Sequence, residues 1–256
     1  MWEIEIATAR NAAIDAGRIL KGLYGNLREI SKKGEIDLVT EADLMSEKAV
    51  INAISHHFPE DYILSEEAGE QGEKTDRMWI IDPLDGTTNF AHSFPFFGVS
   101  IALQVENEVV VGIVYNPCLD EFFEAERGKG AFLNNNAIWV SDQSSLKDSL
   151  IGTGFPYDVY EKPEPVLEYL KKMLINAQGV RRAGAAAIDL CYVAAGRLDG
   201  FWEQGLSPWD TAAGSLIVEE AGGVISDYDG NPYNPFLKTI LASCPGIHNK
   251  MLEVLS

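Results

Sequence analysis

A short apolar run that ends in two aspartates limits how this chain can fold. The run Met78–Ile81 is followed by the residues Asp-Pro-Leu-Asp-Gly and then by small polar residues. Pro83 fixes its own φ and lacks an amide donor, while Gly86 can adopt backbone conformations that other residues resist. The pattern therefore predicts a buried strand that delivers two carboxylates, Asp82 and Asp85, into a tight turn.

Such a turn has two interpretations. The two carboxylates and the carbonyl of Leu84 between them can point at one cation, and hard ions such as Mg²⁺ prefer oxygen ligands of this kind. The next residues, 86–89, can open a helical turn whose unpaired amides attract a phosphate. An ordinary Asp-Pro-x-Asp-Gly turn at the end of a hairpin is an equally good interpretation of this stretch taken alone.

Two further acidic features favour the metal site. Glu66 and Glu67 follow an apolar run just as Asp82 does, and Asp210 stands at the start of a predicted helix. Taken singly, the two glutamates are typical of a solvated loop and Asp210 of a helix N-cap. Only the three acidic features together make a metal site the better interpretation.

Helical and strand patterns follow one another without a strict βαβ rhythm, which predicts an α+β fold built in layers. We expect one domain over residues 1–256, with subdomains of about 1–140 and 141–256 that meet in the polar stretch Ser141–Ser149. The expected elements are helices over 2–24, 43–58, 163–177, 186–196, 210–223 and 250–255, strands at 62–64, 78–81 and 150–155, and an antiparallel meander over 97–140.

Charge and cysteine content exclude several classes of protein. The net charge of -19, from 39 acidic and 20 basic residues, argues against binding to nucleic acid or to an anionic membrane. Cys118, Cys191 and Cys244 form no CxxC pair, so neither a disulfide framework nor a zinc site is indicated. With no signal peptide and no apolar run of about 18 residues, we expect a cytoplasmic protein without a membrane span.

Several competing motifs fail at their key residues. An EF-hand counted from Asp227 would have Pro232 in place of the invariant glycine and Lys238 in place of the bidentate glutamate. The LDGT sequence resembles the DxDGT box of haloacid dehalogenase-type phosphatases, but Pro83 stands where the nucleophile belongs. P-loop, GxSxG and HExxH motifs are absent, and the four histidines lack ligand spacing, so we expect them at the surface or at helix ends.

Two long motifs, WIIDPLDGTTNFAHSFPFFGVSIAL and GLSPWDTAAGSLIVEEAGG, with the acidic pair EE before them, closely resemble the inositol monophosphatase family. The stretch RRAGAAAIDLCYVAAGRLDGFWEQGLSPWD is most similar to bacterial members. The resemblance runs from about Asp37 to Gly230. It implies the layered αβαβα sandwich of the inositol monophosphatase and fructose-1,6-bisphosphatase type, and a homodimer.

The resemblance also implies an activity, the Mg²⁺-dependent hydrolysis of a phosphate monoester by a metal-activated water. The favoured substrate is myo-inositol 1-phosphate, with two or three Mg²⁺ in the active site. Fructose 1,6-bisphosphate, as the main or a second substrate, histidinol phosphate and 3'-phosphoadenosine 5'-phosphate stay open, because the family shares its metal site but not its pocket rim. Outside catalysis, the resemblance leaves open a regulatory partner of the transcription machinery.

Position by position, the resemblance implies the metal ligands. Glu66, Asp82 and the carbonyl of Leu84 match the ligands of a first metal, and Asp82, Asp85 and Asp210 match those of a second. Asp82 would therefore bridge the two ions. A third, weakly held Mg²⁺ would also use Glu66, which is counted among the catalytic residues.

The resemblance implies the remaining site residues as well. Thr87, hydrogen-bonded to Asp43, matches the residue that orients or deprotonates the attacking water. Ala185 stands where several animal relatives carry threonine, so this chain departs from those relatives at the polyol and not at the metals. The residues expected to bind substrate are Asp85, Gly86 and Thr87 at the phosphate and Gly184, Ala185, Ala186 and Glu203 at the polyol.

Overall fold

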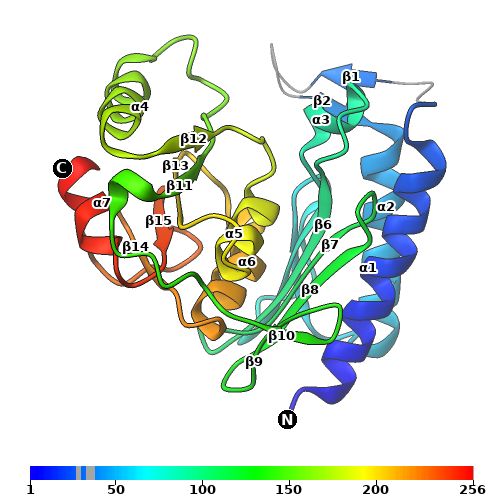
Figure 1. The fold of residues 1–256 in the computed structure, drawn as a ribbon. Helices are drawn as coiled ribbons and strands as arrows, with labels where there is room; N and C mark the ends of the chain where they lie inside the picture. Colours follow the sequence, from blue (N-terminus) through cyan, green and yellow to red (C-terminus); the bar gives the residue numbers. More distant parts are fainter. Residues whose placement is uncertain (27–29, 33–37, 256) are drawn as a thin grey trace.

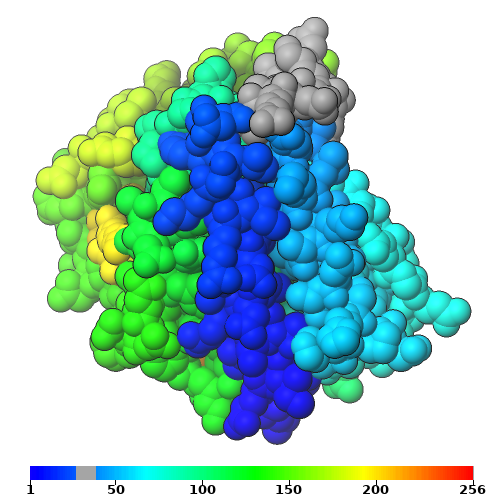
Figure 2. All heavy atoms as spheres, turned by 90° about the vertical axis from the view of Figure 1, so that its right-hand side faces the viewer, coloured from blue at the N-terminus to red at the C-terminus, as the bar shows by residue number. Residues whose placement is uncertain are grey.

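The computed structural model describes residues 1–26, 30–32 and 38–255, and five layers of secondary structure follow one another in it (Figure 1). Helices α1 and α2 lie side by side on the outer face of the larger sheet (Figure 2). Helices α5 and α6 separate this sheet from a smaller one, whose far side is covered by α4 and α7. The α+β class and the αβαβα sandwich are thus confirmed.

The helices lie close to their predicted positions. Their bounds are α1 (Glu3–Leu23), α2 (Glu41–His57), α3 (Thr87–Ala91), α4 (Glu164–Asn176), α5 (Ala186–Ala194), α6 (Pro208–Glu220) and α7 (His248–Leu255), with a 3₁₀ turn η1 (Leu146–Asp148). Helix α3 is the helical turn expected after Gly86. Asp37, where the family resemblance begins, lies outside the described residues.

The larger sheet has eight strands in the order β10-β9-β8-β7-β6-β5-β3-β4. All neighbours are antiparallel except β3 and β5, and the run from β6 to β10 is the predicted meander. The strands are β3 (Tyr62–Ser65), β4 (Gly69–Gln71), β5 (Arg77–Asp85), β6 (Gly98–Val105), β7 (Glu108–Asn116), β8 (Glu121–Glu126), β9 (Gly130–Leu133) and β10 (Asn136–Ile138). A separate antiparallel pair consists of β1 (Ile30–Lys32) and β2 (Leu38–Thr40).

The smaller sheet has five strands in the order β12-β11-β13-β15-β14, with β11 parallel to both its neighbours. Of its strands the sequence patterns predict only β11, because the others are three to five residues long and show no clear alternation. They are β11 (Leu150–Thr153), β12 (Gly179–Arg181), β13 (Gly200–Gln204), β14 (Val224–Ser226) and β15 (Thr239–Ser243). The division into subdomains stays a prediction.

Helix α6 is covered on both sides, and its composition reflects this. Residues 211–218 are all buried, because α6 packs on the larger sheet and on α5 at once. Small residues bring the backbones together: a Cβ on Gly112 of β7 would lie 2.7 Å from the carbonyl oxygen of Ala213, and one on Gly214 would lie 2.7 Å from Cβ of Leu190. This close packing places the first turn of α6 beside the end of β5.

His248 is more enclosed than expected. It begins α7, as predicted for a helix-end residue, but it is only 6% exposed. Its two ring nitrogens lie 3.0 Å from the hydroxyls of Ser226 and Ser243, so the ring links β14 to β15. Burial lowers the pKa of His248, and the polar partners explain why an imidazole is tolerated inside.

Among the described helices, none is both long and apolar enough to cross a bilayer.

Candidate active site

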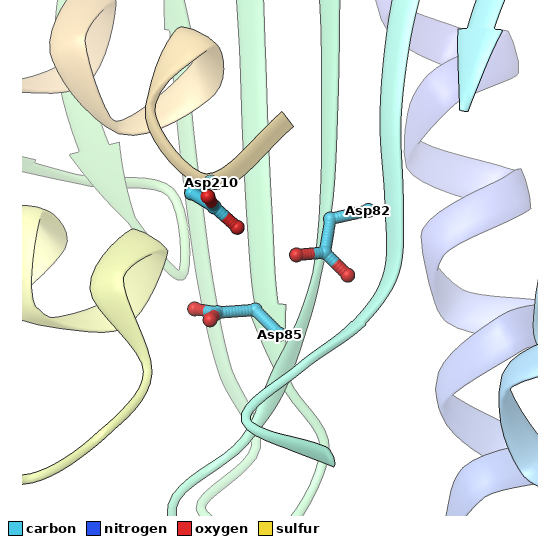
Figure 3. Close-up of side chains that lie close together, drawn as sticks. All are labelled: Asp82, Asp85 and Asp210. Atoms are coloured by element: carbon cyan, nitrogen blue, oxygen red, sulfur yellow. The ribbon is translucent and has the colours of Figure 1, made fainter. Parts of the chain in front are cut away.

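Three aspartates meet between the larger sheet and the start of α6. Carboxylate oxygens of Asp82, Asp85 and Asp210 all lie within 4.8 Å of one another. Figure 3 shows Asp210 pointing from the first turn of α6 toward Asp82 and Asp85, which come from the end of β5. Asp82 is 1% exposed and Asp85 is 7% exposed. The structure thus brings together three acids that are 3 and 125 residues apart in the sequence.

The end of β5 is shaped by an irregularity in the strand pairing. Asp82 pairs with Ser100 of β6 and Asp85 pairs with Gly98, so β5 carries one extra residue there, which bends the strand. The amide of Leu84 donates to Oδ1 of Asp82 at 2.9 Å. Both aspartates can therefore face the same side although an ideal strand would point them in opposite directions.

Asp210 is held in place by a capping box. Ser207 is the N-cap of α6, Asp210 is the third helical residue, and its Oδ2 accepts from the amide of Ser207 at 2.6 Å. Asp210 is therefore not the N-cap itself, as one interpretation of the sequence had it, because the N-cap lies three residues earlier. The hydroxyl of Ser100 donates to the carbonyl of Trp209 at 3.2 Å, which fixes this first turn to β6.

Thr87 lies next to the aspartates and contacts the residue expected to hold it. Its hydroxyl is 3.0 Å from Oδ1 of Asp43 and 3.0 Å from the carbonyl of Leu84. Asp43 is fully buried at the third position of α2, where its other oxygen accepts from the amide and hydroxyl of Thr40. Burial raises the pKa of Asp43, and these hydrogen bonds oppose the shift.

Glu66 reaches the site from β3. Because β3 runs parallel to β5 and Ser65 pairs with Ile81, Glu66 comes level with Asp82, and its amide donates to the carbonyl of Ile81 at 3.2 Å. Glu66 lines the same cleft as Asp85 and Asp210. Its carboxylate is not part of the group that lies within 4.8 Å, so the structure places Glu66 beside the three aspartates rather than among them.

The three aspartates repel one another, and a bound cation would relieve this repulsion. Burial raises the pKa of Asp82 well above its usual value, and the charges of Glu66, Asp85 and Asp210 raise it further. Burial likewise raises the pKa of Asp85 to about 7, although the amides that it accepts from lower it. Buried carboxylates that repel one another are stabilised by a shared divalent ion, and their oxygen donors match Mg²⁺. The residues present therefore fit the metal that the sequence predicts.

The cleft above the cluster holds the predicted substrate residues. It has a volume of about 510 Å³ and is lined by Glu66, Asp85 and Asp210 together with Gly86, Thr87, Gly184, Ala185, Ala186 and Glu203. The amides of Ala186 and Ala187 donate to the carboxylate of Asp85 at 3.2 and 2.8 Å, so both amides are already hydrogen-bonded within the protein. A contact between the Ala186 amide and a substrate would have to compete with that hydrogen bond.

Glu203 comes from β13 and is enclosed by a glycine. It is 7% exposed, and a Cβ on Gly154 would lie 2.1 Å from its Oε2, so any larger residue at position 154 would displace the Glu203 carboxyl. Burial raises the pKa of Glu203 well above its usual value, and the negative charge of Asp210 raises it further.

Several residues near the site were not found from the sequence. Arg182 lines the cleft, and Asp189 is 2% exposed behind it. Ser46 and Glu47 of α2 are also buried and bonded to the loops of the site. Ser46 and Glu47 follow Asp43 by three and four residues, so a helical projection would have placed them on its face. Arg182 had no comparable signal, because a double arginine is common on surfaces.

Comparisons with known proteins identify the family of this chain. The model of the "Inositol monophosphatase family" matches residues 2–255. An inositol-1-monophosphatase from Synechocystis sp. is 46% identical, covering 99% of this chain and 88% of that protein. The Nus factor SuhB of Escherichia coli is 41% identical, covering 95% of this chain and 92% of that protein. A solved inositol monophosphatase from Anabaena (Nostoc) sp. is 42% identical with a TM-score of 0.91, covering 99% of this chain and 95% of that one.

Mg²⁺ should stabilise the protein more at pH 8 than at pH 6. In the metal-free protein the pKa of Asp85 is about 7, above its unfolded value, so the folded chain loses stability as pH rises toward 7. At pH 6 the ion must also displace that proton, which weakens binding about tenfold. With Mg²⁺ at a hundred times its Kd at pH 8, we expect a stabilisation of about 2.7 kcal/mol there and about 1.4 kcal/mol less at pH 6.

Thermal unfolding with Mg²⁺ or with a chelator, at both pH values, measures this difference. Asp229→Asn, at an exposed aspartate of the β14–β15 connection, is a matched control that should leave the Mg²⁺ effect unchanged. Equal stabilisation at the two pH values would contradict the assignment of the buried acids to the cation.

Proposed function

Since this chain belongs to the inositol monophosphatase family, we propose that it is a Mg²⁺-dependent phosphatase whose favoured substrate is myo-inositol 1-phosphate. One observation carries the proposal: Asp82, Asp85 and Asp210 converge within 4.8 Å, and Asp85 and Asp210 line a cleft that also holds Thr87. Bound Mg²⁺ would neutralise the charge of the phosphate and of the leaving oxygen and would activate the attacking water.

The proposed roles of the acids follow from their positions. The charges of Glu66, Asp85 and Asp210 all raise the pKa of Asp82, which supports its role as the ligand that two ions share. The carbonyl of Leu84 faces the hydroxyl of Thr87 at 3.0 Å and is proposed as a further ligand.

Thr87 and Asp43 are proposed to orient the attacking water. Asp43 is buried and fixed by Thr40, so its bond to Thr87 holds the hydroxyl in one orientation. The Thr87 oxygen keeps a lone pair that can accept a hydrogen bond from a water in the cleft. The amides of Gly86 and Thr87, at the start of α3, are proposed to bind the phosphate oxygens.

The opposite wall is proposed to recognise the polyol. Gly184, Ala185 and Ala186 present backbone and small side chains, which leave room for a ring. The buried carboxyl of Glu203 can hydrogen-bond the hydroxyls of a cyclitol or sugar. The relative named inositol-1-monophosphatase, at 46% identity, supports inositol 1-phosphate among the possible phosphate esters.

Arg182 favours fructose 1,6-bisphosphate as a second candidate substrate. It is the only lysine or arginine among the described residues that line the cleft, and its guanidinium lies 5.5 Å from the ring centre of Phe155. Arg182 makes no hydrogen bond or ion pair with any described residue, although its charge lowers the pKa values of the buried Asp189 and Glu203. Its donors can therefore bind a second anionic group on a substrate whose first phosphate lies at the aspartates.

A regulatory role and a homodimer are kept as further proposals. The Escherichia coli relative named Nus factor SuhB, at 41% identity, supports a partner role beside catalysis. The full set of predicted metal ligands is present here, which favours catalysis as the primary function.

Purified protein should release phosphate from myo-inositol 1-phosphate only when Mg²⁺ is present. Chelation with EDTA should abolish the activity and added Mg²⁺ should restore it, because the acidic cluster alone repels a phosphate. Phosphate release, measured across Mg²⁺ concentrations and a panel of phosphate esters, tests the mechanism and ranks the substrates together.

Asp82→Asn is the sharpest variant in that assay, since it removes a charge from both proposed ions. We expect a loss far greater than tenfold in kcat/KM. A variant within tenfold of the unmodified protein would contradict the shared ligand, and activity that survives thorough chelation would exclude the mechanism.

Arg182→Gln should weaken the binding of a bisphosphate substrate more than the binding of a monophosphate. Loss of a charge-assisted hydrogen bond of about 1.5 kcal/mol or more corresponds to a rise of about tenfold in KM for fructose 1,6-bisphosphate. The KM for inositol 1-phosphate should change by less than about threefold. Arg181→Gln, at an exposed neighbour that does not line the cleft, serves as the control. Equal effects on both substrates would remove the argument for the bisphosphate.

A further inference from the structure

One face of α2 contacts three separate segments of the site. Asp43, Ser46 and Glu47 are 0%, 0% and 5% exposed, and their spacing places them on the same side of the helix. Farther along α2 this face continues with the buried apolar residues Val50 and Ile54. The first turns of the helix thus bury polar groups where packing alone would favour apolar ones.

Each of these polar groups is bonded to a different segment. Asp43 binds Thr87, as described above, and the hydroxyl of Ser46 donates to the carbonyl of Pro83 at 2.7 Å. Glu47 binds the turn that follows β3. Because burying a carboxylate costs free energy unless it is well hydrogen-bonded, these contacts explain how Glu47 is retained inside.

Oε1 of Glu47 accepts three hydrogen bonds from residues 65–68. The hydroxyl of Ser65 donates at 2.5 Å, the amide of Glu67 at 3.1 Å and the amide of Ala68 at 2.9 Å. Glu66 is the residue between the first two donors. Its own amide is bound on the other side, to the carbonyl of Ile81. The backbone around Glu66 is therefore clamped between α2 and β5.

We propose that Glu47 is a positioning residue, which holds the turn of residues 65–68 so that the carboxylate of Glu66 faces the three aspartates and completes the cation site. The inference rests on the proposed function, since it concerns the metal ligand Glu66. Glu66 lies beside the group within 4.8 Å rather than inside it. A small displacement of its turn thus decides whether it can share an ion with Asp82.

Two physical effects of Glu47 can be separated by mutation. If Glu47 acts through its hydrogen bonds, Glu47→Gln keeps an acceptor oxygen for all three donors and preserves the turn. If Glu47 acts only by adding negative charge near the cation, Glu47→Gln is as harmful as Glu47→Ala. The inference requires the first outcome.

Calorimetric titration of the protein with Mg²⁺ alone tests the proposal. Glu47→Ala should weaken binding at the site that contains Glu66 by about 10- to 100-fold, the usual effect of losing a group that orients a ligand. Binding at the site formed by Asp82, Asp85 and Asp210 should change by less than about threefold. Glu47→Gln should stay within about threefold of the unmodified protein at both.

Asp199→Ala is the matched control for general destabilisation. Asp199 accepts from the hydroxyl of Ser141 at 2.6 Å and the amide of Leu150 at 2.7 Å, and it precedes β13 at the end opposite Glu203. It should lower the melting temperature without changing Mg²⁺ affinity. Should Glu47→Ala fail to fold, Ser65→Ala removes one of the three donors and should give a smaller loss of the same kind.

Normal Mg²⁺ binding by Glu47→Ala, or equal losses in Glu47→Ala and Glu47→Gln, would overturn the inference. Normal binding by Ser65→Ala would overturn it if Glu47→Ala does not fold. A failure of the proposed function would look different, because the unmodified protein itself would then bind no Mg²⁺ and release no phosphate.

Discussion

The repulsion among three buried carboxylates is the constraint on which the rest of this structure depends. Asp82, Asp85 and Asp210 lie within 4.8 Å of one another, and burial raises the pKa of the first two. The charges of Glu66, Asp85 and Asp210 add to the shift of Asp82, and the charge of Glu66 adds to that of Asp85. Such a cluster opposes folding of the metal-free chain above neutral pH, so other interactions have to hold it together. Functional sites commonly lower stability in this way, and the surrounding packing compensates.

The compensation comes mainly from backbone amides and close helix packing. Leu84 donates to Asp82, Ala187 to Asp85 and Ser207 to Asp210, so each carboxylate is fixed by at least one amide. Gly112 and Gly214 let α6 approach β7 and α5 at backbone distance, which brings Asp210 to the sheet. The five-layer architecture thus serves to bring a helix start and a strand end into contact, and the proposed chemistry occurs where they meet.

The sequence allowed the centre of the site to be predicted, but less of its surroundings. The order of apolar runs and acids, with Pro83 and Gly86, was enough to locate β5, its turn and α3. Strands β12 to β15 were missed because none of them shows a clear alternation of apolar and polar residues. A helical projection from Asp43 could have placed Glu47 on the inner face of α2. Its hydrogen bonds to the turn after β3 and the place of Arg182 in the cleft, however, depend on tertiary packing and leave no local pattern.

The central claim is that these acids form a cation site in which Asp82 is shared. The most direct test is a crystal structure with Mn²⁺, an ion of similar ligand preference whose anomalous scattering locates it without assumptions. We expect two anomalous peaks, both within bonding distance of Asp82, with Asp85 and Asp210 at one of them and Glu66 at the other. Peaks that avoid Asp82, or an empty cluster at saturating Mn²⁺, would contradict it.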